Sequence, residues 1–305
     1  MALTRPLRLK SEVAKLRPET SSSSLPIARV WVDSGVFHLD QSYDYLIPDN
    51  LTSAVRTGIR IQVPFHGREV EALVLSRIAI SDSPVLKSIS KVISHQSVAT
   101  SESLELIEAV ATRWAAHPFD ILRSAIPPRV ASIDKQSFPK LQVRPATNKA
   151  RRSYIQIPPV VNRFDFIAST ISNSPSRGST LIVLPDSNSA HRLQKMIEGS
   201  ILLDSTLERS ERYSNFLRIR NGENLVVIGT RSAIFAPLAG LSAIYIVDEG
   251  SENHYEVRTP GWNVRDVAIL RSMRAAISLH FIGYSPSSEI ARLIESRWLE
   301  YSSSK

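Results

Sequence analysis

The sequence predicts an α/β protein made of a small, mostly β N-terminal unit and a larger lobe in which parallel strands alternate with helices. Three observations indicate this. Apolar and polar residues alternate with a period of two over residues 28–32 and 59–65, which is typical of strands. From about residue 154, apolar runs alternate with helix-like segments, as in a parallel sheet covered by helices. One of these runs, residues 243–247, ends in Asp248-Glu249, so two carboxylates are expected at the edge of that sheet.

Composition limits the class of protein. The 305 residues are 43% hydrophobic, enough for each of two domains to bury a core. No apolar run approaches the roughly 20 residues of a membrane helix, and the N-terminus lacks the apolar segment of a secretory signal, so we expect a cytoplasmic protein with no membrane partner. The absence of cysteine excludes disulfides and thiolate zinc sites within this chain. The net charge of +8 favours a polyanionic partner.

The chain then divides in order. Residues 1–25 carry five basic side chains and a serine run, which predicts a disordered basic tail. Residues 26–130 form the mostly β domain, in which His66-Gly67 is expected to form a hairpin turn and residues 100–116 a helix. Residues 131–155 have scattered charge and little periodicity, so we expect a linker.

Residues 156–305 form the second lobe. Strands are expected over residues 180–184 and 277–282 and opening at Leu225 and Ala243, with helices over residues 187–198, 209–220 and 264–274. This alternation argues for a parallel sheet with helices on both faces.

Two stretches resemble one family. The string VIGTRSAIFAPL (residues 227–238), followed by Asp248-Glu249 and a later Arg265-Asp266, is similar to the PriA family of bacterial replication-restart helicases, so the lobe is expected to be RecA-like. The strings SYDYLIP (residues 42–48) and GIRIQVPFHGR (residues 58–68) resemble that family's 3′-DNA-binding domain, which captures the 3′ end of a nascent strand.

That resemblance implies a terminus-binding pocket formed by Tyr43, Asp44, the His66-Gly67 turn and Lys87. An aromatic ring can stack on the last base, a carboxylate can accept a hydrogen bond from the sugar hydroxyl, and a lysine can neutralise phosphate. The structural alternative for Asp44 is a buried or turn-capping carboxylate. His66 departs from the small residue that many relatives have at this turn.

The same resemblance implies ATP and Mg²⁺ in the lobe, but the phosphate-binding motif is missing. A P-loop requires G-x-x-x-x-G-K-[ST], and none of the eleven glycines precedes a lysine. The corresponding positions hold Pro158-Pro159 and Arg163, and the family's D-E-E-H appears as DEGS at residues 248–251. Prolines remove the N–H donors that a phosphate needs. Arg163, Asp248 and Glu249 are therefore interpreted as a vestigial nucleotide and magnesium site, as in the actinobacterial branch of the family.

We accordingly expect a DNA-binding replication-restart protein without helicase activity, with no catalytic residues and no bound cofactor. The resemblance implies forked or single-stranded DNA and primosome proteins as partners, namely a single-stranded-DNA-binding protein and the machinery that loads the replicative helicase. Two alternatives stay open. An active ATP-dependent 3′→5′ helicase needs an unusual phosphate site and a second lobe, and we expect only one lobe in these 305 residues. A small-molecule α/β enzyme needs a catalytic constellation, and none of the seven histidines lies in a recognisable one.

Overall fold

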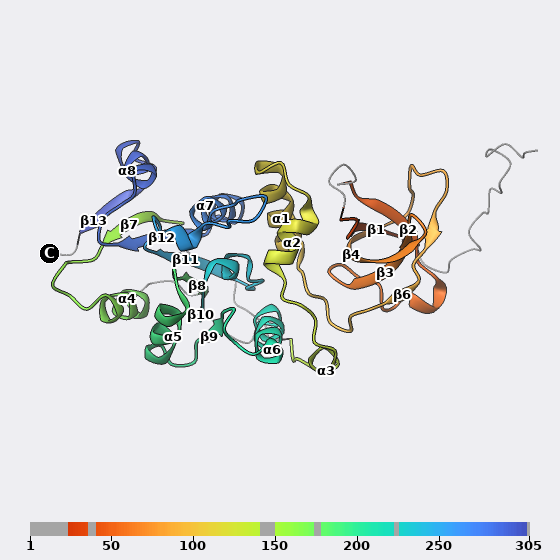
Figure 1. Cartoon of the computed structure of the whole chain (residues 1–305), viewed down its shortest axis with the longest axis horizontal. Helices are drawn as coiled ribbons and strands as arrows, with labels where there is room; N and C mark the ends of the chain where they lie inside the picture. Colours follow the sequence, from red (N-terminus) through yellow and green to blue (C-terminus); the bar gives the residue numbers. More distant parts are fainter. Residues whose placement is uncertain (1–23, 36–40, 141–149, 174–177, 223–225, 304–305) are drawn as a thin grey trace, which may run out of the picture. The chain divides into compact units, whose positions relative to one another are not determined.

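The computed structural model describes residues 24–35, 41–140, 150–173, 178–222 and 226–303 (Figure 1). The predicted basic tail lies almost entirely outside these residues. Within them the chain forms two compact units, one ending at Ile93 and the other beginning at Ser94, and each is described by itself. None of the described helices combines the length and the apolar character that crossing a membrane requires.

The first unit is a six-stranded, mostly antiparallel sheet in the order β5-β2-β1-β4-β3-β6. Its strands are β1 (Ile27–Val32), β2 (Tyr43–Leu46), β3 (Arg60–Phe65), β4 (Arg68–Ile78), β5 (Lys87–Ser88) and β6 (Lys91–Val92), with a 3-10 turn η3 (Asp49–Leu51) after β2. The predicted hairpin is present: Phe65 pairs with Arg68 across the two-residue turn His66-Gly67. Both turn residues have positive φ, 44° and 80°, as type I′ hairpin turns require.

The sheet of the first unit closes on itself through one short segment. In residues 87–92, β5 pairs with β2 (Tyr45 with Lys87) and β6 pairs with β3 (Gln62 with Lys91). Between them the amide of Ile89 donates to the carbonyl of Leu46. The strands β2 and β3, which would otherwise be the edges of the sheet, are thereby covered, and this closing segment places Lys87 beside β2.

The second unit is built on a seven-stranded sheet in the order β13-β7-β12-β11-β8-β10-β9, in which every pairing is parallel. Its strands are β7 (Arg152–Gln156), β8 (Ser179–Val183), β9 (Ile201–Leu203), β10 (Val226–Gly229), β11 (Leu241–Val247), β12 (Ser278–Gly283) and β13 (Glu300–Ser303). The strands β8 and β11 are buried along their whole length, as expected for a sheet covered on both faces.

Helices flank this sheet, and Figure 1 shows α7 on one side of it and α4 and α5 on the other. The α-helices are α1 (Ser101–Arg113), α2 (Pro118–Ala125), α3 (Ala131–Asp134), α4 (Arg163–Ser172), α5 (Ser187–Met196), α6 (Arg209–Arg220), α7 (Val264–Ala275) and α8 (Ser288–Glu295); the 3-10 turns are η4 (Arg231–Phe235) and η5 (Glu252–His254). The predicted α/β class, with a β-rich N-terminal part followed by a parallel sheet flanked by helices, is confirmed.

The helices α1 and α2 belong by their contacts to the second unit, although the sequence places them in a domain ending near residue 130. The buried Arg271 on α7 donates to Glu102 of α1 and to the carbonyls of Ile234 and Ala236. The predicted linker also differs from the structure, because α3 and the start of β7 lie within residues 131–155. Residues 141–149 of that segment are outside the described part.

Candidate nucleic-acid interface

A cavity of about 570 Å³ opens beside β2 in the first unit. We call it the β2 pocket. Its walls are β2, the start of β5 and the loop between β4 and β5, and its lining residues are Arg29, Gln41, Ser42, Tyr43, Asp44, Tyr45, Ser81, Asp82, Ser83, Val85 and Lys87. Three of the residues predicted to bind a strand terminus, Tyr43, Asp44 and Lys87, therefore meet in one cavity.

The carboxylate of Asp44 lies in this pocket and is held by hydrogen bonds from Arg29 and Ser81, an arrangement that we call the clamp. Arg29 on the neighbouring strand donates from Nε to Oδ1 at 2.9 Å and from Nη2 to Oδ2 at 3.0 Å, and the Ser81 hydroxyl donates to Oδ2 at 2.6 Å. The hydrogen bond from Arg29 holds the pKa of Asp44 below its usual range, against the opposing effect of burial. The carboxylate is therefore ionised at neutral pH and can only accept hydrogen bonds.

Lys87 and Tyr43 flank the carboxylate. Lys87 is exposed on β5, one register position from Asp44, because Tyr45 is its direct partner. Tyr43 is half-buried, and its ring meets Phe65 edge-on with centroids 5.0 Å apart. Tyr45 is a core residue: its hydroxyl donates to the carbonyl of Pro64, and burial raises its pKa to about 12.

The His66-Gly67 turn lies outside the lining of the β2 pocket, although the sequence groups it with the other terminus-binding residues. It is connected to the pocket through an aromatic series, in which the His66 ring meets Phe65 at 4.6 Å and Phe65 meets Tyr43. Both turn residues are exposed, and their predicted role in binding a strand terminus stays a prediction.

The predicted nucleotide site in the second unit contains an internal ion pair. Arg163, the first residue of α4, places Nη1 3.0 Å from Oδ2 of Asp248 at the end of β11. Glu249 is buried and accepts hydrogen bonds from the backbone N–H and the hydroxyl of Ser287, which caps α8. The two carboxylates that would bind Mg²⁺ and orient water are thus engaged with side-chain and backbone groups of the protein.

The turn before α4 does not present a phosphate cradle. The side chain of Asn162 caps the helix by accepting from the N–H groups of Phe164 and Asp165, the donors that an anion at a helix N-terminus would use. The amide of Val161 is bonded to the carbonyl of Pro158. The side chain of Val160, in the same turn, points into solvent and is 95% exposed.

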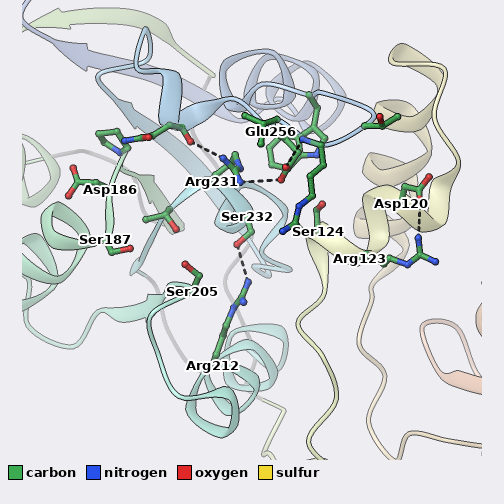
Figure 2. Close-up of a pocket in the computed structure, with 17 residues that line it drawn as sticks. Asp120, Arg123, Ser124, Asp186, Ser187, Ser205, Arg212, Arg231, Ser232 and Glu256 are labelled. Atoms are coloured by element: carbon green, nitrogen blue, oxygen red, sulfur yellow. Dashed lines mark hydrogen bonds and ion pairs between the residues drawn. The ribbon is translucent and has the colours of Figure 1, made fainter.

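A larger cavity of about 850 Å³ lies in the second unit, at the carboxyl ends of β8, β9 and β10. We call it the arginine pocket. Figure 2 shows Arg212 and Arg231 approaching it from opposite sides. The lining residues are Asp120, Arg123, Ser124, Pro185, Asp186, Ser187, Ser205, Arg212, Thr230, Arg231, Ser232, Asn253, Glu256, Val257, Arg258, Thr259 and Trp262.

The cations of the arginine pocket are not all neutralised. Arg231 is paired with Glu256 at 3.2 Å and Arg123 with Asp120 at 2.6 Å. Arg212 is different: among the described residues its guanidinium makes one bond, to the Ser232 hydroxyl at 3.3 Å, and its Nε is buried without a partner. Burial lowers the pKa of Arg212. A partly desolvated guanidinium of this kind is suited to an anionic ligand.

One buried carboxylate, that of Asp204, holds two residues that line this pocket, Ser187 and Thr230. Asp204 follows β9 and accepts hydrogen bonds from Ser187, Thr230 and both the amide and the hydroxyl of Thr206. Burial acts to raise its pKa, but these four bonds outweigh burial and hold it below the usual range.

Neither Arg212 nor Arg231 was predicted from the sequence to belong to a site. The signal that could have found Arg231 is its place in Thr230-Arg231-Ser232, directly after a parallel strand, where ligand-binding residues gather. Nothing local in the sequence marks Arg212, since it lies within a helix and reaches the pocket only through the fold.

Comparisons with known proteins find similar sequences for the first part of the chain and for most of its length. Residues 29–127 match the family model PriA_3primeBD, described as the 3′DNA-binding domain (3′BD). The chain is 30% identical over 292 residues to the probable replication restart protein PriA of Mycobacterium tuberculosis, covering 86% of this chain and 44% of the relative. It is 28% identical to the Mycobacterium leprae protein of the same name, covering 86% and 45%. The chain thus spans less than half the length of these relatives.

The structural similarity is weaker. The C-terminal domain of S. cerevisiae Dbp5, solved with Gle1 and IP6, is 16% identical with a TM-score of 0.39, covering 51% of this chain and 89% of that one, and a similarity this low supports no assignment. Residues 29–127 thus match the PriA 3′DNA-binding domain, and the chain is similar to replication restart proteins PriA over 86% of its own length.

Proposed function

We propose that this protein binds DNA at replication forks, recognises the free 3′ end of a strand in the β2 pocket, and serves replication restart without unwinding DNA. The observation that supports this most directly is the grouping of Tyr43, Asp44 and Lys87 in one cavity. They offer a ring for stacking, an ionised acceptor for a sugar hydroxyl and a cation for the neighbouring phosphate. Primosome proteins, namely a single-stranded-DNA-binding protein and the loading machinery of the replicative helicase, are the proposed protein partners.

The arginine pocket is proposed as the second DNA contact. Arg212, Arg231 and Arg258 come from three different segments and face one cavity, and guanidinium groups bind phosphodiesters well. Such contacts hold the strand without reading its sequence. They also make affinity strongly dependent on salt.

Titration against forked DNA tests the proposed 3′-end recognition. Two forks that differ only in ending in a 3′-hydroxyl or a 3′-phosphate are compared by fluorescence anisotropy, for the wild-type chain and for Asp44→Ala. The wild type should prefer the hydroxyl, because a phosphate is repelled by the ionised Asp44. The variant should lose the preference and keep most of its salt-sensitive binding. Equal affinities of the wild type for both forks would refute the pocket assignment.

The proposal that the lobe does not unwind DNA rests on the ion pair between Arg163 and Asp248. A triphosphate with Mg²⁺ requires that carboxylate and several converging N–H donors. Here the carboxylate faces a guanidinium, and two N–H groups of the α4 N-terminus are capped by Asn162. The lobe is therefore proposed to be a structural platform.

The competing function, an active ATP-dependent 3′→5′ helicase, is separated from ours by one assay. Purified protein with forked DNA, ATP and Mg²⁺ should release no phosphate above the rate without protein, and Asp248→Asn should bind DNA as the wild type does. DNA-stimulated hydrolysis that disappears in Asp248→Asn would establish the helicase alternative.

A further inference from the structure

The clamp on Asp44 contains two residues that the proposed 3′-end site does not yet use, Arg29 and Ser81. They come from β1 and from the loop after β4, 15 residues before and 37 residues after Asp44. Both line the β2 pocket. The side chain of Asp44 is only 10% exposed, whereas that of Arg29 is 40% exposed, so the arginine is the more accessible of the two to a ligand.

The hydrogen bonds of the clamp leave little of Asp44 for a ligand. A carboxylate offers about four lone-pair sites. Oδ2 accepts from Arg29 Nη2 and from Ser81, and Oδ1 accepts from Arg29 Nε. One lone pair, on Oδ1, remains. Because the group is ionised, that lone pair can take a hydrogen-bond donor such as a hydroxyl, and it repels the oxygens of a phosphate.

Arg29 has donors to spare after clamping Asp44. A guanidinium carries five N–H bonds in a fixed plane, and the clamp uses one on Nε and one on Nη2. Among the described residues, Arg29 Nη1 makes no hydrogen bond. The free donors lie at the same pocket as the free lone pair of Oδ1.

We propose that Arg29 is a specificity-determining residue of this site, which fixes the orientation of Asp44 with the help of Ser81 and itself donates to the phosphodiester next to the strand terminus. The recognised ligand is then a free hydroxyl adjoining a phosphodiester, held by an acceptor and a donor on one rigid pair. This inference rests on the proposed 3′-end recognition and adds the residue that sets its selectivity.

Substitutions at Arg29 separate its two roles. Arg29→Lys keeps the charge but cannot form the bidentate clamp, so the preference for a 3′-hydroxyl over a 3′-phosphate fork should fall about tenfold, the usual worth of one charge-assisted hydrogen bond. The slope of log affinity against log salt should stay unchanged. Arg29→Gln should lose the preference and also lower the slope by about 0.7, the value for one phosphate contact on a single strand. Ser81→Ala keeps both hydrogen bonds from Arg29 to Asp44 and should lower the preference less than Arg29→Lys does.

A double variant shows whether Arg29 acts through Asp44. If it does, Asp44→Ala and the combination of Asp44→Ala with Arg29→Lys should have the same hydroxyl preference, since the clamp has nothing left to orient. Unchanged affinity of Arg29→Lys for the 3′-phosphate fork shows that the variant is folded. If it has lost that affinity as well, near-ultraviolet circular dichroism identifies misfolding, and the comparison is then made with Arg29→Gln.

The results distinguish this inference from the function beneath it. A wild-type chain without any 3′-hydroxyl preference contradicts the proposed function itself. A wild type that has the preference, together with a folded Arg29→Lys that retains it in full, overturns only the role of Arg29. Additive effects of Asp44→Ala and Arg29→Lys on the preference would also overturn it, because the arginine would then act independently of the carboxylate.

Discussion

Replacing aspartate by asparagine should affect two buried carboxylates of the second unit very differently. Asp134 and Asp204 are both 0% exposed. The donors to Asp134 are the amides of His95 and Gln96 at 2.9 and 3.4 Å, Arg129 Nε at 2.8 Å and the Tyr213 hydroxyl at 3.1 Å. Each oxygen accepts from one backbone amide. A backbone N–H or a guanidinium N–H cannot become an acceptor.

Asp204 instead receives three hydroxyls and one amide. The amide and hydroxyl of Thr206 point to Oδ1, and the hydroxyls of Ser187 and Thr230 point to Oδ2. A hydroxyl can rotate and accept where it formerly donated. An asparagine at residue 204 can therefore place its oxygen toward the amide and its nitrogen toward the two hydroxyls, whereas at residue 134 its nitrogen must face a fixed N–H in either orientation.

The expected costs follow from this difference. Asp134→Asn also leaves Arg129 without its anion, so we expect a loss of about 3 kcal/mol or more in the free energy of unfolding. Asp204→Asn should lose about 1 kcal/mol, the difference between charged and neutral hydrogen bonds. For a unit of this size, these values correspond to melting points lower by about 6–12 °C and about 2–4 °C.

Calorimetric unfolding of the full chain from pH 7 down to pH 3 measures both effects. Burial is the largest single effect on the pKa of Asp134, and it acts to raise that pKa. The hydrogen bonds to the carboxylate together outweigh burial and hold the pKa below its usual range. The stabilisation is thus fully present above the unfolded pKa of about 3.9 and is lost as the pH falls through the folded pKa. The difference between wild type and Asp134→Asn should narrow below about pH 4. Equal shifts for the two variants at pH 7 would refute the argument from donor type.

Three further predictions concern DNA binding and are checked by anisotropy titrations. Lys87→Gln should lower the slope of log affinity against log salt by about 0.7, as expected when one phosphate is no longer neutralised. The control is Lys91→Gln, which changes an exposed lysine on the same closing segment outside the β2 pocket and should leave the slope unchanged. Equal effects of the two variants would exclude a specific role for Lys87. Arg212→Gln should weaken the binding of single-stranded DNA about tenfold. The control Arg292→Gln, at an exposed position on α8, should weaken it by less than about twofold. A larger loss of affinity in Arg292→Gln than in Arg212→Gln would contradict the proposed role of the arginine pocket. Tyr43→Phe should bind like the wild type, because its hydroxyl has no partner among the described residues, whereas Tyr43→Ala should lose about 1–3 kcal/mol of stacking.

Local patterns predicted most of the secondary structure of both units. The hairpin at His66-Gly67 and the helix over residues 209–220 are encoded within a few residues by turn chemistry and periodicity. The pattern was less informative where a strand is buried on both faces. Trp31 alternates with Val30 and Val32 and would therefore point to the other, outward face of the sheet, yet it is 5% exposed; an alternating pattern does not show whether the second face is covered. Short strands such as β9 and β13 carry too few residues for a period to appear.

The residues grouped in the β2 pocket could be predicted in part, but their pairings could not. Tyr43, Asp44 and Lys87 were proposed through the family resemblance, without the partners that hold them. Arg29 and Ser81 reach Asp44 through strand register and a loop, and Arg163 meets Asp248 across 85 positions of sequence. No local pattern states which charges will be neighbours, since that depends on how the strands are ordered in the sheet.

The boundary between the two units has a consequence for how this family is divided into pieces. The match to the 3′DNA-binding domain model, residues 29–127, extends past Ile93. It includes the helices α1 and α2, which belong by their contacts to the second unit. The range matched by the domain model and the range of the first compact unit therefore end at different residues. A fragment cut at residue 127 would carry α1 and α2 without the buried Arg271 that binds Glu102, and would expose apolar surface that promotes aggregation. A fragment cut after Ile93 would keep the closed sheet whole, with the β2 pocket intact.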